Sequence, residues 1–292
     1  MFGGSVGMYS LVVKVLAVVF IFCMSTLLRA EGYKIDEVEF DSHGAKLAGS
    51  ILFPDNDEVH AAIVFVHGSG KQSRNMHVAA RFASEGIAAL VYDKRGVGRS
   101  GGKYEGKQSV SEKNINLLAD DAIAALNVLH NHPKTKSVPK GLTGISQAGW
   151  IVPLAAEKSG TADFMVLWSG PVTKVSEEDI YSKYTSDQDD KRVPSYQEAL
   201  DARKVKYVWP DFLGKDSNPS DSLAKLEIPG LWVFGQNDGS IPVDLSIVRL
   251  RQQIDMGRDY EYVLFPSLGH NNMKETFPTV LDWIAGKTRN SD

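Results

Sequence analysis

The stretch Gly144-Ile145-Ser146-Gln147-Ala148-Gly149 predicts a serine on a tight turn between a strand and a helix. The short run Gly141-Leu142-Thr143 precedes it, and an apolar helical segment, 150–156, follows it. Such a turn exposes the serine Oγ and directs the N–H groups that follow toward the same point. Ala148 stands where a second glycine is commoner, so the G-x-S-x-G match is imperfect. The pattern therefore predicts a nucleophile at Ser146, with an ordinary loop serine as the alternative.

A serine nucleophile of this type needs an acid and then a histidine later in the chain. The apolar strand expected at 231–234 ends in a polar loop that contains Asp238. A second strand, 261–265, runs into the loop that contains His270. Because the carboxyl ends of parallel strands lie at one edge of a sheet, Ser146, Asp238 and His270 can converge there.

Apolar runs of strand length alternate with helical segments along the body of the chain. Continuous apolar runs are typical of strands buried on both faces. The expected strands before Ser146 are Glu37–Ser42, Lys46–Phe53, Ala61–Val66, Ile87–Tyr92 and the run 141–145, and Phe164–Trp168 follows it. Helical spacing is visible at 76–84 and 115–130. The alternation predicts an α/β fold with a mostly parallel central sheet flanked by helices, opened by an antiparallel hairpin.

The alternation breaks between about residues 171 and 222. This stretch is polar and charged, and it predicts a small, mostly helical cap inserted into a domain that spans 31–292. Its scattered aromatic side chains either line a substrate pocket or pack the cap onto the body. They are Tyr181, Tyr184, Tyr196, Tyr207, Trp209 and Phe212.

Five motifs occur in order along the chain: His67-Gly68-Ser69-Gly70, the run 92–100, the turn around Ser146, the loop 235–242 and Gly269-His270. Taken together, they resemble the motifs of the alpha/beta-hydrolase superfamily, from about Ile35 to the C-terminus. Within it, the chain is similar to bacterial serine esterases related to the serine aminopeptidase and prolyl-oligopeptidase-like hydrolases. The resemblance implies hydrolysis of carboxylic esters. The alternatives are a serine peptidase or amidase on the same fold, or a binding protein without catalytic activity.

The expected roles follow from the chemistry of acyl transfer. Ser146 Oγ attacks the carbonyl carbon, His270 accepts and returns the proton, and Asp238 orients the imidazole. Asp244 competes for the role of the acid, but it follows Pro242 and is expected to open the next helix.

Two backbone N–H groups are expected to form the oxyanion hole. One belongs to Gln147, the residue after the nucleophile. The resemblance places the other just after His-Gly, at Ser69, with Gly70 as the second choice.

Several other kinds of site fit the sequence less well. The G-x-G-x-x-G match at 96–101 continues as a loop, whereas a dinucleotide site needs a helix that opens at the glycines. His130-Asn131-His132 lacks a third ligand at a useful spacing for a metal. A formal net charge of −4 with mixed charges gives no broad attraction for nucleic acid. We therefore expect no cofactor, no metal and a small-molecule ester substrate, while the oligomeric state is left open.

The N-terminus, residues 1–30, predicts either a signal peptide or a membrane anchor. Residues 11–28 are nearly all apolar, interrupted by Lys14, and the uninterrupted part has the length of a signal-peptide core. Ala30 suits a cleavage site, but Leu28 is a bulky choice two positions earlier. The only cysteine, Cys23, lies in this segment, so the body has no internal disulfide. Both interpretations predict an exported protein, periplasmic or secreted.

Overall fold

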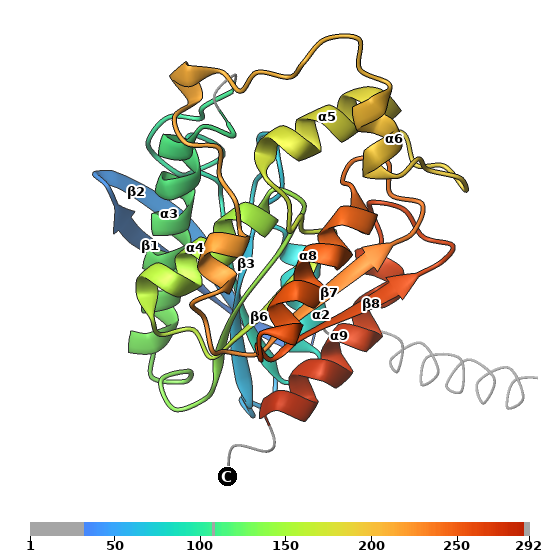
Figure 1. Cartoon of the computed structure of the whole chain (residues 1–292). Helices are drawn as coiled ribbons and strands as arrows, with labels where there is room; N and C mark the ends of the chain where they lie inside the picture. Colours follow the sequence, from blue (N-terminus) through green and yellow to red (C-terminus); the bar gives the residue numbers. More distant parts are fainter. Residues whose placement is uncertain (1–31, 107–108, 289–292) are drawn as a thin grey trace, which may run out of the picture.

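The computed structural model describes residues 32–106 and 109–288, and one twisted sheet runs through its centre (Figure 1). The strands are β1 (Tyr33–Ser42), β2 (Ala45–Pro54), β3 (Ala61–Val66), β4 (Ile87–Tyr92), β5 (Lys140–Ile145), β6 (Phe164–Trp168), β7 (Gly230–Gly235) and β8 (Tyr260–Phe265). Their order in the sheet is β1-β2-β4-β3-β5-β6-β7-β8. The pairs β1–β2 and β2–β4 are antiparallel, and the other pairs are parallel. The predicted α/β fold with a mostly parallel sheet is confirmed.

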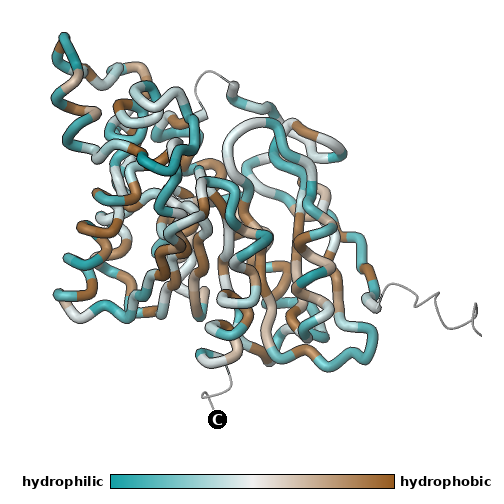
Figure 2. The backbone as a smooth tube through the Cα atoms, turned by 90° about the vertical axis from the view of Figure 1, so that its right-hand side faces the viewer, coloured by the Kyte–Doolittle hydropathy of each residue, from teal (hydrophilic) through white to brown (hydrophobic). Residues whose placement is uncertain are grey.

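Helices cover both faces of the sheet. The helices of the body are α2 (Met76–Ala83), α3 (Glu112–Asn131), α4 (Ala148–Ser159), α8 (Val243–Asp255) and α9 (Met273–Thr288). Side chains of β3 alternate between two apolar clusters, one shared with α3, α4 and α8 and the other with α2 and α9. Figure 2 shows the hydrophobic positions concentrated in these inner layers, whereas the outer loops are largely hydrophilic. This two-sided burial explains why the central strands are continuous apolar runs.

The main differences from the sequence prediction lie at the ends of elements. Helix α3 begins at Glu112, three residues before the start that apolar spacing indicated, because the Ser111 hydroxyl accepts the N–H of Asn114 and caps it. The sequence predicts a last helix from about Met273 to Ile284, but helix α9 continues to Thr288, and its last turn contains Lys287 and Thr288. A cap residue and a polar last turn add no apolar period, so spacing alone did not reveal them.

The segment between β6 and β7 holds α5 (Val175–Thr185), α6 (Tyr196–Asp201), the short 3-10 helix η1 (Asp211–Leu213) and α7 (Ser220–Leu223), joined by long loops. The first part of this segment, with α5 and α6, lies at the carboxyl end of the sheet, and its last helix, α7, packs beside α4 (Figure 1). We call residues 171–222 the cap. In the described parts of the chain, no helix is long and apolar enough to cross a membrane. The signal-peptide and anchor predictions concern residues 1–30, which lie outside the described residues.

Candidate active site

Ser146 lies on the turn between β5 and α4, in a backbone conformation that residues with a side chain rarely adopt. Its φ is +57°, in the left-handed region. The turn is held by two bonds: the Ser146 N–H donates to the carbonyl of Trp168 at 3.0 Å, and the Gly149 N–H donates to the Ser146 carbonyl at 2.8 Å. A non-glycine residue in this region stores roughly 1–2 kcal/mol of strain. Strain of this kind points to a functional residue.

The small residues around Ser146 are required by close packing. A Cβ added to Gly144 would lie 2.4 Å from the Ala148 Cβ and 2.7 Å from the Val66 carbonyl oxygen. The Ala148 methyl itself is fully buried, so the turn accommodates alanine there. A Cβ on Gly149 would lie 2.5 Å from the Pro171 ring. The departure from G-x-S-x-G at Ala148 is therefore compatible with the turn.

Substituting Gly144 by alanine tests this packing. Because the added methyl meets the backbone of β3, we expect Gly144→Ala to lower the free energy of unfolding by about 1–3 kcal/mol. Gly286→Ala is the matched control, because a Cβ there has nothing within 4 Å. Urea unfolding of both variants measures the difference. Equal stability of the two variants would contradict the packing argument.

Asp238 and His270 are joined directly at the carboxyl end of the sheet. His270 Nδ1 lies 2.8 Å and 3.0 Å from the two carboxylate oxygens of Asp238. Asp238 is fully buried, and its Oδ1 also accepts the N–H groups of Ser240 and Ile241 at 2.8 Å and 3.0 Å. The competing acid, Asp244, instead accepts the N–H of Tyr196, in the cap. Of the two candidates, the structure brings Asp238 to the histidine.

Ser146 and His270 are linked indirectly, through the residues at the end of β6. Ser146 bonds to Trp168, and the next residue, Ser169, donates its hydroxyl to the His270 carbonyl at 2.8 Å. In the described residues, Ser146 Oγ makes no hydrogen bond to the imidazole. Catalytic hydrogen bonds of this kind are often long before substrate binds and tighten in the complex. The bond to Asp238 engages Nδ1 of the imidazole and leaves the other ring nitrogen, Nε2, for a different partner.

The surroundings of His270 raise the pKa of its imidazole above the ordinary value of 6.5. Burial alone would lower the pKa, but the hydrogen bond and charge of Asp238 outweigh it, and the charges of Asp189 and Asp187 act in the same direction. The charged imidazole is the form that these carboxylates stabilise.

Three residues that the sequence patterns missed hold the His270 loop. Ser169, with φ at +44°, also accepts a hydrogen bond from Asn272 Nδ2 at 3.0 Å. Asp189, in the cap, accepts the N–H of His270 through Oδ2 and the N–H of Gly239 through Oδ1, both at 3.0 Å. No spacing rule connects an acidic residue of a cap loop to these two glycine-containing loops, so only the fold reveals it.

The two predicted oxyanion donors lie on neighbouring loops. Strands β3 and β5 are adjacent, and Val66 pairs with Gly144. A Cβ on Gly68 would lie 3.4 Å from the Ser146 Cβ, so this loop runs directly beside Ser146. Among the described residues, neither the Ser69 nor the Gln147 N–H donates to a protein acceptor. The Gly70 N–H is also without an acceptor there, and Gly70 stays an alternative.

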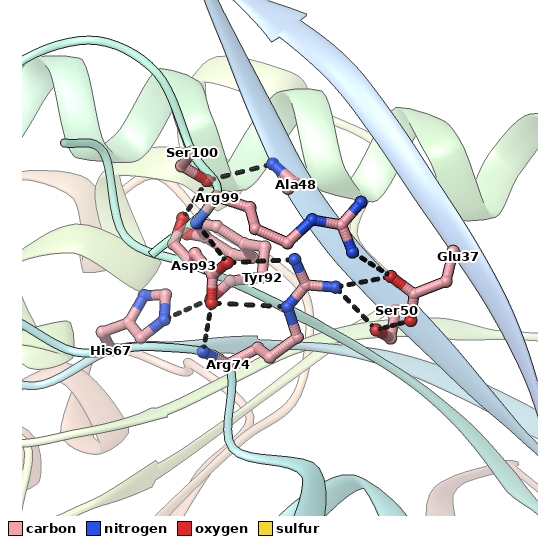
Figure 3. A network of polar contacts seen from close by, with 9 residues as sticks. All are labelled: Glu37, Ala48, Ser50, His67, Arg74, Tyr92, Asp93, Arg99 and Ser100. Carbon is pink, nitrogen blue, oxygen red and sulfur yellow. Dashed lines mark hydrogen bonds and ion pairs between the residues drawn. The ribbon is translucent and has the colours of Figure 1, made fainter. Parts of the chain in front are cut away.

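The G-x-G-x-x-G stretch, 96–101, folds around a carboxylate (Figure 3). Asp93 Oδ2 accepts the N–H of Arg99 at 2.9 Å and Nη2 of Arg74 at 3.0 Å. A Cβ on Gly98 would lie 2.6 Å from the Asp93 carboxyl carbon. A carboxylate therefore occupies the place where a nucleotide-binding loop would present N–H groups to phosphate. In the part of the chain that the structure describes, no group of three His, Cys, Asp or Glu residues is arranged to hold a metal.

Comparison with known proteins identifies relatives of two kinds, esterases or lipases and peptidases. The chain is 34% identical over 130 residues to a monoacylglycerol lipase of Mycolicibacterium smegmatis, which is 44% of this chain and 43% of the lipase. It is 26% identical over 211 residues to the uncharacterized peptidase YtmA of Bacillus subtilis, which is 70% of this chain and 74% of the peptidase. The match thus spans less than half of the lipase.

Solved structures share the fold at low sequence identity. The Pyrococcus furiosus esterase Pf2001 has a TM-score of 0.64 at 16% identity, over 89% of this chain and 91% of the esterase. The Pyrococcus horikoshii acylaminoacyl peptidase has a TM-score of 0.66 at 18% identity, over 93% of this chain and 44% of the peptidase. Residues 57–215, more than half of the chain, match the family described as serine aminopeptidase, S33. The chain therefore belongs to this family of the alpha/beta-hydrolase superfamily and is a serine hydrolase.

Proposed function

We propose that this chain hydrolyses carboxylic esters through an acyl-enzyme at Ser146, with Asp238 and His270 as the other members of the triad. The observation that carries the proposal is the strained Ser146 turn at the same edge of the sheet as a buried carboxylate bonded to an imidazole. The relatives that are esterases and lipases support ester substrates.

The geometry supports two half-reactions. Ser146 Oγ attacks the ester carbonyl carbon while His270 Nε2 takes the hydroxyl proton, and the developing oxyanion accepts the N–H groups of Ser69 and Gln147. The intermediate collapses, the alcohol leaves with the proton from His270, and the acyl group stays on Ser146. Water then attacks the acyl-enzyme, with His270 again as the base, and releases the carboxylic acid.

The pH dependence follows from the raised pKa of His270. Only the neutral imidazole accepts the serine proton, so kcat/KM falls as the pH drops through this pKa. We expect the midpoint of that fall above 6.5, the ordinary histidine value. Asp189→Asn removes one of the charges that raise the pKa, so the midpoint should move to lower pH in this variant. A rate that stays flat down to strongly acidic pH would contradict a histidine base.

A second candidate is the cleavage of aminoacyl amides, and Glu178 on α5 favours it. Its neighbours Glu177 and Asp179 form ion pairs with Arg249 and Lys183. The Glu178 carboxylate makes no hydrogen bond or ion pair within the described residues.

The electrostatic surroundings of Glu178 are also unusual. Burial, followed by the nearby charges of Asp187, Asp179 and Asp238, raises the pKa of its carboxyl to about 8. A cationic amino terminus beside this carboxylate would relieve the repulsion between these groups.

A paired substrate panel separates the two candidates. We expect the purified protein to hydrolyse short-chain p-nitrophenyl esters and to be labelled by a fluorophosphonate at Ser146. Glu178→Gln should leave ester turnover unchanged. If aminoacyl p-nitroanilides are the better substrates and Glu178→Gln raises only their KM, the peptidase candidate replaces the esterase. Absence of labelling in the folded protein would remove both and favour a binding protein.

We also propose that the catalytic body is exported, on the strength of the apolar segment at residues 11–28. Cell fractionation combined with N-terminal sequencing tests this proposal. A mature chain that starts after residue 30 identifies a signal peptide, and a full-length chain in the membrane fraction identifies an anchor. Full-length chain in the cytoplasmic fraction would contradict export.

A further inference from the structure

Lys94 is a buried cation next to both loops of the proposed oxyanion hole. It is 3% exposed, and its Nζ donates to the Gly68 carbonyl and to Gln147 Oε1, both at 2.8 Å. Within the described residues, no carboxylate forms an ion pair with this ammonium. The adjacent cation, Arg95, is by contrast paired with the buried Asp121. Lys94 thus places a positive charge in the interior without a negative partner.

A buried charge of this kind is costly for folding. An ammonium removed from water loses hydration that two neutral acceptors replace only in part. Burial lowers the pKa of Lys94 to about 8. The neighbouring His67 responds to the same environment: burial, then the charge of Lys94, lowers its pKa to about 4. His67 is therefore neutral, and Lys94 supplies the positive charge at this place.

The loop that carries Lys94 is fixed on both sides (Figure 3). Asp93, the preceding residue, accepts the backbone N–H of Arg74 at 2.9 Å and the N–H of Arg99 at 2.9 Å. The Lys94 N–H itself donates to the Gln72 carbonyl at 3.0 Å. These bonds hold the Lys94 backbone at the end of β4, and its side chain reaches the loops that follow β3 and β5. The ammonium is therefore preorganised.

The contact with Gly68 controls the direction of one oxyanion donor. The Gly68 carbonyl and the Ser69 N–H belong to the same peptide group, which is trans. In a planar trans peptide the C=O and N–H point in opposite directions, so a bond that holds the oxygen also fixes the N–H. A cationic donor at the oxygen also polarises the peptide and makes its N–H a stronger donor.

The contact with Gln147 acts on the other donor. The side chain of Gln147 is stretched between Lys94 and the carbonyl of Ser109, to which its Nε2 donates at 2.9 Å. Gln147 is fully buried at the start of α4. Lys94 thus contacts the peptide group that contains the Ser69 N–H and the side chain of Gln147, the two residues that would supply N–H groups to the oxyanion.

We propose that Lys94 is the positioning residue of the oxyanion hole, holding the Gly68–Ser69 peptide and the Gln147 side chain while its charge favours the negative tetrahedral intermediate. The proposal rests on ester hydrolysis at Ser146. The proposal favours the Ser69 N–H over the Gly70 N–H as the second donor, because Lys94 donates to the carbonyl of the Gly68–Ser69 peptide. A fixed charge in a site that excludes water stabilises the intermediate without reorganisation.

The test compares Lys94→Met and Lys94→Gln with a control at Lys140. Lys140 is also buried, at 4% exposure, and its Nζ donates to the carbonyls of Lys136 and Val138 at 3.2 Å and 2.6 Å. It lies at the start of β5, whereas Ser146 follows the end of the same strand. Lys140→Met therefore removes a similar buried cation far from the proposed chemistry.

We expect both Lys94 variants to lower kcat for a p-nitrophenyl ester by about 10- to 100-fold, with a much smaller change in KM. The inhibition constant of an arylboronic acid, which forms a tetrahedral anionic adduct with serine, should rise by a similar factor. Lys140→Met should keep the wild-type kcat and inhibition constant. Lys94→Gln keeps hydrogen-bond donors without the charge. If Lys94→Met does not fold, the kcat and the inhibition constant of Lys94→Gln test the proposal.

Wild-type kcat and boronate inhibition in a folded Lys94 variant would overturn the proposal. An equal loss in Lys140→Met would also overturn it, because the effect would then be one of general stability. If the wild-type protein neither hydrolyses esters nor reacts with a fluorophosphonate, the proposed function itself fails. The two failures are therefore distinguishable.

Discussion

Ser146→Ala should reduce ester hydrolysis by roughly 10⁴- to 10⁶-fold, the largest effect of any single substitution in this chain. The variant removes the only atom that forms the covalent bond to the acyl group. The oxyanion donors at Ser69 and Gln147 remain, so a small rate above the uncatalysed reaction should persist. Turnover of a p-nitrophenyl ester and mass spectrometry of fluorophosphonate-treated protein measure both consequences.

Two further serine variants serve as controls. Ser159→Ala, at the far end of α4, should keep full activity. Ser146→Gly should be as inactive as the alanine variant but more stable than it by about 1 kcal/mol, because glycine adopts the left-handed conformation without strain. Undiminished turnover in Ser146→Ala would exclude the acyl-enzyme route.

Asp238→Asn should lower kcat by about 10³- to 10⁴-fold with little change in KM. The carboxylate accepts the Nδ1 proton of His270, which leaves Nε2 unprotonated and able to act as a base. The amide of asparagine can donate to Nδ1, and the imidazole then carries its proton on the wrong nitrogen. The asparagine oxygen can still accept the N–H groups of Ser240 and Ile241, so the loop should keep its shape.

Asp244→Asn is the matched control for this prediction. Asp244 bonds to the Tyr196 N–H in the cap and not to the imidazole, so its variant should retain nearly all of the wild-type kcat. Steady-state kinetics of the two variants under the same conditions decide between the acids. A larger loss in Asp244→Asn than in Asp238→Asn would reverse the assignment.

The sequence predicted the arrangement of the sheet well because buried parallel strands leave a clear signature. Ala61–Val66 and Ile87–Tyr92 are strands with the predicted bounds, since every residue in them is buried. The turn at Ser146 was also recognisable in the sequence, because its neighbours leave no space for a side chain at position 144 and glycine is therefore required there. These features are set by short stretches of sequence or by one-dimensional periodicity.

The surroundings of the site were less accessible from the sequence. Asp189 and Lys94 act through contacts between residues far apart in the chain. Asp189 accepts backbone N–H groups, and Lys94 donates to one backbone carbonyl and one side-chain amide, so no local pattern reveals either set of contacts. Lys94 lies within a recognised motif, yet the motif does not show which way its side chain turns. Ser169 adopts a left-handed backbone conformation, although it is neither glycine nor asparagine, the residue types that usually adopt it.

The cap is bound to the loops that carry Asp238 and His270. Thr185 donates to the Gly239 carbonyl, the Tyr181 hydroxyl donates to that of Asp238 at 3.1 Å, and Asp189 spans both loops. Gly239 and Gly269 have no room for a side chain, because Gln188 and Asp189 press against them. A cap grafted from a relative would lack the side chains that make these contacts with the Asp238 and His270 loops. Redesign of substrate range by exchanging caps must therefore carry residues 185–189 along, or the chimera will lose rate as well as selectivity.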